Sequence, residues 1–432
     1  MIRRQTANDY VEDLLDSELQ AHRLSPVDRG LCQTLVYGIA RWQMTLDWLI
    51  ARKTEGRTQK EALRVLLQLG LFQMFWLERI PNHAAVHATV ELAKQLGLGP
   101  QSGFVNAVLR GYTRERDATE KLLRELKVSQ PALGHSHPEW LYERWRARWG
   151  AERAVQLMEW NNAAPPAYAR VNKLKANAAK LTAQWEMEGV KFATVKWDWT
   201  ESDEVFRLES HPPLASLRSF KEGMFYIQDP STLLAARELG PKPGESVLDL
   251  CAAPGGKTAL IAQMMENRGR IAAQDRDPSR LELIRENCAR LGVTIAETSI
   301  PPSGILVNPG KKFDRVLVDA PCSNTGVMRR RVELRWRVRP EEIERLRATQ
   351  LELLRQAAPR LKPGGTLVYS TCSLEPEENS AVAQSFVAEQ PEFKLEKERE
   401  LLPFADGVDG AYVARLMKAA NRGDAEARSG TE

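Results

Sequence analysis

The sequence predicts an α/β protein in which an all-helical N-terminal domain precedes a doubly wound domain, with a small α+β connector between them. The first 130 or so residues have helical apolar spacing, residues 160 to 230 have a mixed pattern, and from about residue 240 strands alternate with helices. A chain of 432 residues is long enough for two or three domains. The expected boundaries are 1–130, 131–235 and 236–420, followed by a polar tail, 421–432.

The N-terminal domain is predicted to be a small helical bundle. Residues 31–50 carry apolar side chains at three- and four-residue steps, and residues 61–76 are apolar on most sides. The second segment is therefore expected to be the central helix. Residues 84–99 and 102–116 form two further predicted helices, and the first of these ends on glycines, which suits a helix stop.

The connector begins with a tryptophan-rich helix at residues 137–150. Trp140, Trp145 and Trp149 lie near one predicted face, with arginines over the rest. Such tryptophans either pack between domains or form an RNA-facing edge. Short strands are expected at three places around a helix at residues 178–189, namely 165–172, 190–197 and 223–229.

The third domain alternates strands with helices, which predicts a doubly wound sheet. In such sheets ligands bind beyond the carboxyl ends of the strands, where the strand order reverses. The expected strands are 245–251, 269–275, 314–321, 364–370 and 411–419, and the expected helices are 256–265, 278–292, 341–361 and 376–390.

Composition excludes several other classes of protein. Five widely spaced cysteines favour reduced thiols in the cytoplasm over a disulfide framework. No apolar run is long enough for a membrane span, and the N-terminus has no signal core, so we expect a cytoplasmic protein without a membrane partner. His83 and His87 share a helix face but have no third ligand nearby, so no metal site is expected. A net charge of +4 permits a nucleic-acid partner.

A glycine-containing loop, "LDLCAAPGGKT" at residues 248–258, follows the first strand of the doubly wound domain. Its small residues allow a ligand to approach the backbone closely, but the loop is not a dinucleotide motif. Asp275 closes the next strand, where a carboxylate accepts hydrogen bonds from ribose hydroxyls. Together these features predict a nucleoside ligand without a pyrophosphate, and S-adenosylmethionine fits. The predicted cofactor site comprises Cys251, Ala252, Ala253, Pro254, Gly255, Gly256, Lys257, Asp275, Arg280 and Asp319.

Two cysteines occupy matching positions after strands that are neighbours in a sheet of methyltransferase type. Cys322 lies in "DAPCSNTG" and Cys372 in "YSTCSLEPEEN". A thiolate that attacks carbon 6 of cytosine makes carbon 5 nucleophilic enough to take a methyl group. Asp319 is placed to meet the nitrogen edge of the base, and Lys257 stands at a helix start where the dipole disfavours a cation, which favours a role facing the cleft. Two buried structural thiols or a redox pair are the alternatives.

A basic run, "RRRVELRWRVR" at residues 329–339, follows the first cysteine motif. Such a density of arginine predicts phosphate contacts by Arg329, Arg330 and Arg331, with base stacking on Trp336. A solvated charged face is the alternative interpretation.

These motifs resemble those of the RNA cytosine-5 methyltransferase family, the NOL1/NOP2/Sun group. The N-terminal segments at residues 31–50, 63–94 and 103–115 further resemble the NusB-like helical domain of its RsmB (Sun/Fmu) branch. The resemblance covers nearly the whole chain. It implies a Rossmann-like class I methyltransferase domain, S-adenosylmethionine as cofactor, and methylation of a cytosine in 16S ribosomal RNA, either free or in a small-subunit assembly intermediate. A monomer is expected.

Within this resemblance the family's nucleophile falls on Cys372, and the cysteine that assists product release falls on Cys322. Asp319 would bind the target base, residues 251–257 the cofactor, and Asp275 its ribose. One feature departs from the family pattern: residues 292–313 hold no aspartate to bind the adenine amino group. Glu297 or a backbone carbonyl would have to replace it.

Two alternative functions stand beside this interpretation. A related methyltransferase acting on transfer RNA would share the cysteine motifs, but the NusB-like N-terminus argues against it. A ribosome assembly factor that binds RNA without catalysis would share the helical domain, but two intact cysteine motifs argue against that.

Overall fold

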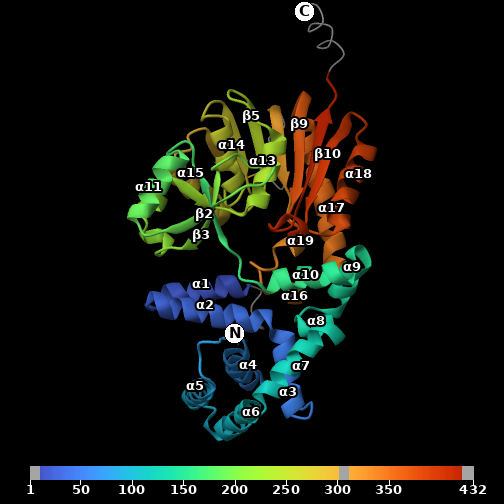
Figure 1. Ribbon diagram of the computed structural model, residues 1–432. Coiled ribbons are helices and arrows are strands. Elements are labelled where there is room, and N and C mark those ends of the chain that lie inside the picture. Colours follow the sequence, from blue (N-terminus) through green and yellow to red (C-terminus); the bar gives the residue numbers. More distant parts are fainter. Residues whose placement is uncertain (1–9, 301–310, 421–432) are drawn as a thin grey trace, which may run out of the picture. The chain divides into compact units, whose positions relative to one another are not determined.

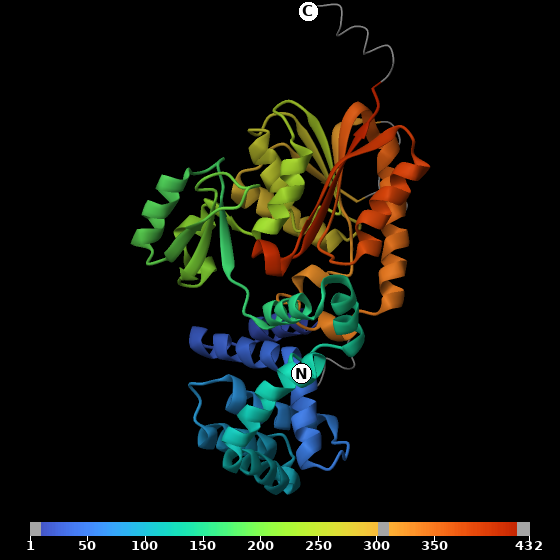
Figure 2. The same ribbon diagram turned by 45° about the vertical axis from the view of Figure 1, so that its right-hand side comes forward.

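The computed structural model describes residues 10–300 and 311–420 (Figure 1; Figure 2 gives a second view). The chain forms two compact units. The helical unit contains the chain up to Ala164 together with Met328–Arg337, and the α/β unit contains Pro165–Val327 and the chain from Val338 onward. The predicted fold class is therefore confirmed.

The helical unit is built around α4, as its apolar surface predicted. Leu67 and Leu71 of α4 are fully buried among side chains of the neighbouring helices. Trp145 of α9 is also buried, and the ring of His137 lies 5.9 Å from its own. The main helices of this unit are α1 Val11–Ala21, α2 Pro26–Arg41, α3 Gln43–Lys53, α4 Glu61–Trp76, α5 Asn82–Gln95, α6 Ser102–Arg114, α7 Arg116–Ser129, α8 Pro131–Gly134, α9 Glu139–Trp149 and α10 Ala151–Asn162.

Residues 328–337, here called the inserted segment, leave the α/β unit and pack in the helical unit. They include the short helix α16, Leu334–Arg337 (Figure 1). The guanidinium of Arg335 is fully buried and donates to the carbonyl of Asn161 at 3.0 Å and to Oδ1 of Asn162 at 2.7 Å. This insertion was not predicted from the sequence.

A seven-stranded sheet in the order β10-β11-β9-β8-β5-β6-β7 forms the centre of the α/β unit (Figure 1). The pairs from β9 to β7 are parallel, whereas β10 and β11 add antiparallel strands at one side. The predicted doubly wound sheet is thus present, although β7 and β10 were not predicted. Its strands are β5 Ser246–Leu250, β6 Arg270–Gln274, β7 Ala296–Ser299, β8 Phe313–Asp319, β9 Leu361–Thr371, β10 Phe393–Leu401 and β11 Ala411–Lys418.

Helices cover both faces of this sheet. Successive residues of one strand enter different cores, so Val247 packs in the cluster that includes α13–α15 and Leu248 packs in the cluster that includes α17 and α18. Such burial on both faces is the reason that these strands are apolar throughout. The helices are α13 Leu233–Leu239, α14 Gly256–Met264, α15 Pro278–Leu291, α17 Pro340–Ala357 and α18 Ser380–Glu389.

A second, smaller sheet has the antiparallel order β2-β3-β1-β4. Its strands are β1 Ala167–Val171, β2 Lys191–Val195, β3 Val205–Ser210 and β4 Phe225–Ile227, and α11 is Ala178–Met187. The ring of Trp185, fully buried on α11, meets the edges of Phe206 and Phe225 at 5.5 and 5.3 Å. The predicted helix and three of the strands are present, but β3 was not predicted.

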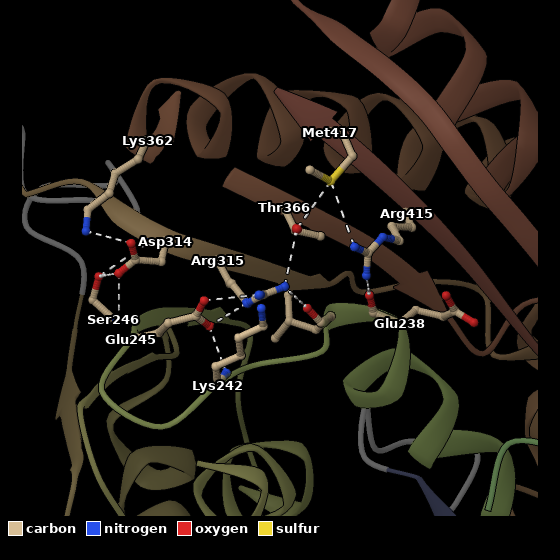
Figure 3. A network of polar contacts seen from close by, with 11 residues as sticks. Glu238, Lys242, Glu245, Ser246, Asp314, Arg315, Lys362, Thr366, Arg415 and Met417 are labelled. Carbon is tan, nitrogen blue, oxygen red and sulfur yellow. Dashed lines mark hydrogen bonds and ion pairs between the residues drawn. The ribbon is translucent and has the colours of Figure 1, made fainter. Parts of the chain in front are cut away.

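The amino ends of the parallel strands are joined by polar contacts (Figure 3). Arg315 of β8 donates from Nε to Glu245 at 2.5 Å, and Asp314 accepts from Ser246 Oγ at 2.6 Å and from Lys362 at 2.7 Å. Burial alone would raise the pKa of Asp314, but the hydrogen bonds from Lys362 and Ser246 lower it to about 2. This edge of the sheet is therefore tied together by ion pairs, and the opposite edge carries the cysteines.

Candidate active site

Two cysteine loops leave the carboxyl ends of β8 and β9, which are parallel neighbours with Asp319 opposite Ser370. Because the strands are adjacent, the loops that follow them lie together, as expected from the sequence. The sulfur atoms of Cys322 and Cys372 are 3.3 Å apart, and all five cysteines of the chain are free thiols.

Asn324 connects the two cysteine loops. Its Oδ1 accepts a hydrogen bond from the Cys372 thiol at 2.9 Å, and its Nδ2 donates to the carbonyl of Cys322 at 2.7 Å. Its φ of +59° is left-handed, a conformation that asparagine tolerates better than most residues. Sequence reasoning missed this residue, although it lies within the motif that holds Cys322.

Their surroundings make Cys322 and Cys251 harder to ionise than a free cysteine. The hydrogen bond with Cys372 and burial raise the pKa of Cys322 well above its ordinary value. A raised pKa favours the protonated thiol of Cys322 beside Cys372. Burial, together with Asp275 and Asp319, raises the pKa of Cys251 to about 12, so Cys251 is a poor nucleophile.

Asp319 forms an ion pair at the end of β8. Lys257 Nζ lies 2.6 Å from one carboxylate oxygen, and Ser370 Oγ donates to the other at 2.7 Å. Burial alone would lower the pKa of Lys257, but the carboxylate outweighs it and raises that pKa. Lys257 is therefore a cation beside Asp319, which accounts for a lysine at the first turn of α14.

The glycine-containing loop and Asp275 have the features that an adenosyl group requires. Asp275 is 3% exposed and accepts from the backbone N–H of Ala253 at 3.3 Å and of Asp277 at 3.2 Å. These two long hydrogen bonds leave acceptor capacity for ribose hydroxyls. Gly255 has a φ of +97°, which favours glycine. A Cβ on Gly256 would lie 2.8 Å from the Tyr226 ring, so both glycines are required.

Arg280 supports the same loop. Its guanidinium lies 3.6 Å from Asp275 and donates to the carbonyl of Ala253 at 3.1 Å. Arg280 thereby connects the start of α15 to the segment between Cys251 and Lys257. The predicted cofactor residues therefore lie at one edge of the sheet.

Glu297 is poorly placed to replace the missing adenine-binding acid. It lies opposite Ala272, in the middle of β6, and not at the carboxyl end of the strand. Its carboxylate pairs with Arg270 at 2.6 Å, and its side chain is 65% exposed. Residues 301–310, which follow β7, lie outside the described part of the chain.

The arginine run has a packing role that the sequence analysis did not anticipate. Arg329 is 2% exposed, and its guanidinium lies 3.9 Å from the centre of the Trp160 ring. The indole of Trp336 donates to the carbonyl of Ala40 at 2.6 Å. Both side chains thus hold the inserted segment within the helical unit. RNA contact stays a prediction for Arg330 and Arg331, which are half-buried and exposed respectively.

A buried carboxylate beneath the cysteine loops was also missed. Glu378 is fully buried and accepts hydrogen bonds from the serines that follow Cys322 and Cys372. The repeated Cys-Ser pair and the run "PEEN" were visible in the sequence. Nothing in their spacing showed that one acid binds both serines.

Comparison with known proteins supplies the family. The profile of the family described as "16S rRNA methyltransferase RsmB/F" matches residues 236–417, the NusB family matches residues 2–114, and a ferredoxin-like domain of RsmF/B-like methyltransferases matches residues 137–213. The probable ribosomal RNA small subunit methyltransferase B of Bacillus subtilis is 38% identical, over 97% of each chain. The chain belongs to the ribosomal RNA small subunit methyltransferase B family. A second family member, from Vibrio cholerae, is 36% identical over 92% of this chain and 91% of its own.

Solved structures of other methyltransferases share the fold of much of this chain. A methyltransferase homologue from Pyrococcus horikoshii is 33% identical, with a TM-score of 0.57 over 66% of this chain and 97% of its own. NSun6 from the same organism, solved with SFG, is 25% identical, with a TM-score of 0.59 over 66% of this chain and 99% of its own.

The described part of the chain, residues 10–300 and 311–420, has no cluster of three or more histidine, cysteine, aspartate or glutamate residues suited to a metal ion. It also has no helix with the length and apolar character that crossing a bilayer requires.

Proposed function

We propose that this protein transfers a methyl group from S-adenosylmethionine to carbon 5 of a cytosine in 16S ribosomal RNA, through a covalent bond between Cys372 and carbon 6. The observation that carries the proposal is the 3.3 Å separation of the Cys322 and Cys372 sulfur atoms beside the Asp319–Lys257 pair. One reactive base then meets both thiols and this ion pair.

The reaction begins at Cys372. Its thiol first gives up its proton to a base or solvent; the thiolate then attacks carbon 6 of the cytosine, and the new sulfur–carbon bond pushes electron density toward carbon 5. Asn324, whose Oδ1 lies 2.9 Å from the Cys372 sulfur, fixes the direction of the attack. As the bond forms, nitrogen 3 of the base gains negative charge. Lys257, held as a cation 2.6 Å from the Asp319 carboxylate, stabilises that charge, and Asp319 accepts a hydrogen bond from the amino group at the same edge of the base.

Cofactor binding falls to the loop after β5 and to Asp275 after β6. S-adenosylmethionine, when bound, offers an electrophilic methyl group to carbon 5. Asp275 holds the ribose hydroxyls, and Gly255 and Gly256 keep the backbone close to the ligand. SFG, with which NSun6 was solved, is an analogue of this cofactor.

Release of the product depends on Cys322. After methylation the proton on carbon 5 leaves to a base or solvent, and the bond between Cys372 and carbon 6 breaks with its electron pair returning to sulfur. Cys322 keeps its proton because its pKa is raised by the hydrogen bond to Cys372 and by burial. Its S–H donates a hydrogen bond to the departing thiolate and stabilises it.

The substrate is expected to be 16S RNA or a small-subunit precursor particle, on which the protein acts as a monomer in the cytoplasm. The named relatives are ribosomal RNA small subunit methyltransferases, which supports this choice over transfer RNA.

The proposal is tested by single-turnover methyl transfer to undermodified 16S RNA. Cys372→Ala should abolish product, whereas Cys32→Ala, a control in the helical unit, should leave the rate within about twofold. Retention of full activity by Cys372→Ala would show that another group attacks the base. Bisulfite sequencing of ribosomal RNA from cells lacking the protein should then reveal one unmethylated cytosine.

A further inference from the structure

One buried carboxylate, that of Glu378, contacts both cysteine loops. Glu378 Oε1 accepts from the backbone N–H of Ser323 at 2.8 Å and from Gln350 at 3.0 Å. Glu378 Oε2 accepts from the hydroxyl of Ser373 at 2.5 Å and from that of Ser323. Ser323 follows Cys322, and Ser373 follows Cys372, so one carboxylate contacts the residue next to each sulfur.

This arrangement explains why both cysteines are followed by serine. The two hydroxyl oxygens lie 3.1 Å from each other, and each also reaches Glu378. A fully buried carboxylate is costly unless hydrogen bonds satisfy it, and burial does raise the pKa of Glu378. An apolar residue would fill this space without that cost. The cluster therefore has a purpose other than packing.

We propose that Glu378 is a positioning residue for the two-cysteine reaction proposed above: by binding Ser323 and Ser373 it holds the Cys322 and Cys372 sulfur atoms over one pyrimidine. Glu378 itself does not touch the substrate. Loss of its carboxylate frees the two loops to shift, and a displacement of about 1 Å at a reacting atom is enough to cost about 100-fold in rate.

The first experiment measures single-turnover methyl transfer at saturating RNA and cofactor. Glu378→Leu should lower the rate about 100-fold while the Kd values for RNA and cofactor stay within about threefold. Glu378→Gln should recover most of the rate, because its carbonyl still accepts from Ser323 N–H and its amide donates to the hydroxyls. Glu377→Gln, the same change one residue away, is the control. A rate for Glu378→Leu within threefold of wild type overturns the proposal.

A second readout reports the sulfur positions without methylation. Diamide oxidises the two thiols to a disulfide and takes up their hydrogen atoms, so the rate of forming the Cys322–Cys372 bond measures their proximity. It should fall in Glu378→Leu and stay high in Glu377→Gln. This readout keeps the positioning role separate from failure of the proposed methylation, because it needs neither RNA nor cofactor. Equal disulfide rates in the two variants contradict the positioning role.

If Glu378→Leu does not fold, variants of Ser323 and Ser373 test the proposal instead. Ser323→Ala and Ser373→Ala each remove one hydroxyl donor from Glu378, and the double variant removes both. Because both hydroxyls act through the same carboxylate, the two effects on the methylation rate should be strongly non-additive. Additive effects would mean that Glu378 does not couple the loops.

A second and independent observation lies in the helical unit. A groove of about 680 Å³ runs between α5 and α6. Its α6 wall carries Arg110 and Arg114, both exposed, for which the described residues provide no ion-pair partner. Its α5 wall carries Lys94, which pairs with Glu91 at 2.7 Å. The polar side chains that could contact a ligand in the groove are His83, His87, Lys94, Asn106, Arg110 and Arg114.

The charge of the groove selects an anion. Glu91 is the one acid among its lining residues, and Lys94 already neutralises it. Arg110 and Arg114, one helical turn apart, therefore leave an excess positive charge on an open surface. Guanidinium groups in such a row suit successive phosphates of a nucleic acid. An acidic protein is less well matched, because the groove offers few apolar anchors.

We infer that this groove binds the phosphate backbone of the RNA substrate, an inference that rests on the proposed function. Affinity for 16S RNA is measured by fluorescence anisotropy over a range of salt. Arg110→Gln with Arg114→Gln should weaken binding at least about tenfold and reduce the slope of log K against log salt by roughly 1.4, about 0.7 for each contact. Arg124→Gln, on α7, is the control.

The outcomes separate this inference from the catalytic proposal, because Cys372→Ala should bind RNA like wild type. An unchanged slope in the double arginine variant overturns the groove assignment. Unchanged affinity for free RNA, with weakened affinity for the small-subunit particle, would instead assign the groove to a ribosomal protein and overturn the RNA inference.

Discussion

Gly326 packs directly against the backbone of Cys372. The N–H of Gly326 donates to the Cys372 carbonyl at 3.0 Å, and a Cβ added to Gly326 would lie 2.8 Å from that oxygen. The last glycine of the first cysteine motif is therefore required for the second cysteine loop to approach.

Gly326→Ala should thus impair catalysis by displacing Cys372. Backbone atoms of Gly410 and Cys372 surround the added methyl group, so the loops must move apart. We expect methyl transfer to fall about 100-fold, with cofactor affinity unchanged. Gly30→Ala, where nothing lies within 4 Å of the added atom, is the control and should have no effect. Wild-type activity in Gly326→Ala would refute the close approach.

Asp319→Asn should show whether Asp319 acts in methyl transfer or in RNA binding. The substitution removes the charge that pairs with Lys257 at 2.6 Å, and with it the group that holds this cation beside the base. Loss of one such stabilising group costs about 100- to 1000-fold in rate. Single-turnover rates and RNA affinities measured together should show a large fall in the first and little change in the second. A parallel fall in both would indicate a binding role.

Asp314→Asn should reduce stability at neutral pH but not in acid. The folded-state pKa of Asp314, about 2, lies below that of an unfolded aspartate, so its ionised form stabilises the folded protein above about pH 4. This contribution disappears as the pH falls through about 2. Because the site is partly exposed, we expect a difference of about 1 kcal/mol. Urea midpoints of both proteins, compared at pH 7, pH 3 and pH 2, should draw together below about pH 4 and converge near pH 2.

Arg335→Met should destabilise the helical unit. Arg335 donates to the buried carbonyl of Asn161 and to the half-buried side chain of Asn162, and its loss leaves both acceptors without this donor. A cost of about 3 kcal/mol follows from removing such a buried charged donor. Hydrogen exchange should accelerate in α10 and the inserted segment. Arg331→Ala, which changes an exposed side chain, should leave exchange unaltered, and similar exchange in both variants would contradict the packing role.

The sequence predicted the architecture wherever apolar patterns were strong. It placed β5, β6, β8, β9 and β11 because strands buried on both faces are apolar throughout. It missed β10, "FKLEKEREL", whose charged side chains resemble a solvated segment. As an edge strand paired only with β11, β10 tolerates charge and gains protection against aggregation from it.

The sequence predicted the reactive groups of the candidate site but not the residues that hold them in place. Cys322 and Cys372 were found because they follow apolar strands, and strand order then brought them together. Glu378 was missed because its partners come from two loops that the sequence does not show in contact. Arg329 was predicted to contact RNA. Its packing on Trp160 could not be foreseen, because it depends on a chain path that leaves the α/β unit.

The central claim is that Cys372 bonds to the target cytosine while Cys322 promotes its release. The most direct measurement is mass spectrometry of Cys322→Ala after incubation with 16S RNA and cofactor, followed by protease and ribonuclease digestion. We predict a methylated cytidine attached to the peptide that contains Cys372, stable to denaturation. Attachment to any other residue, or no attachment while methylation proceeds at the wild-type rate, would contradict the account.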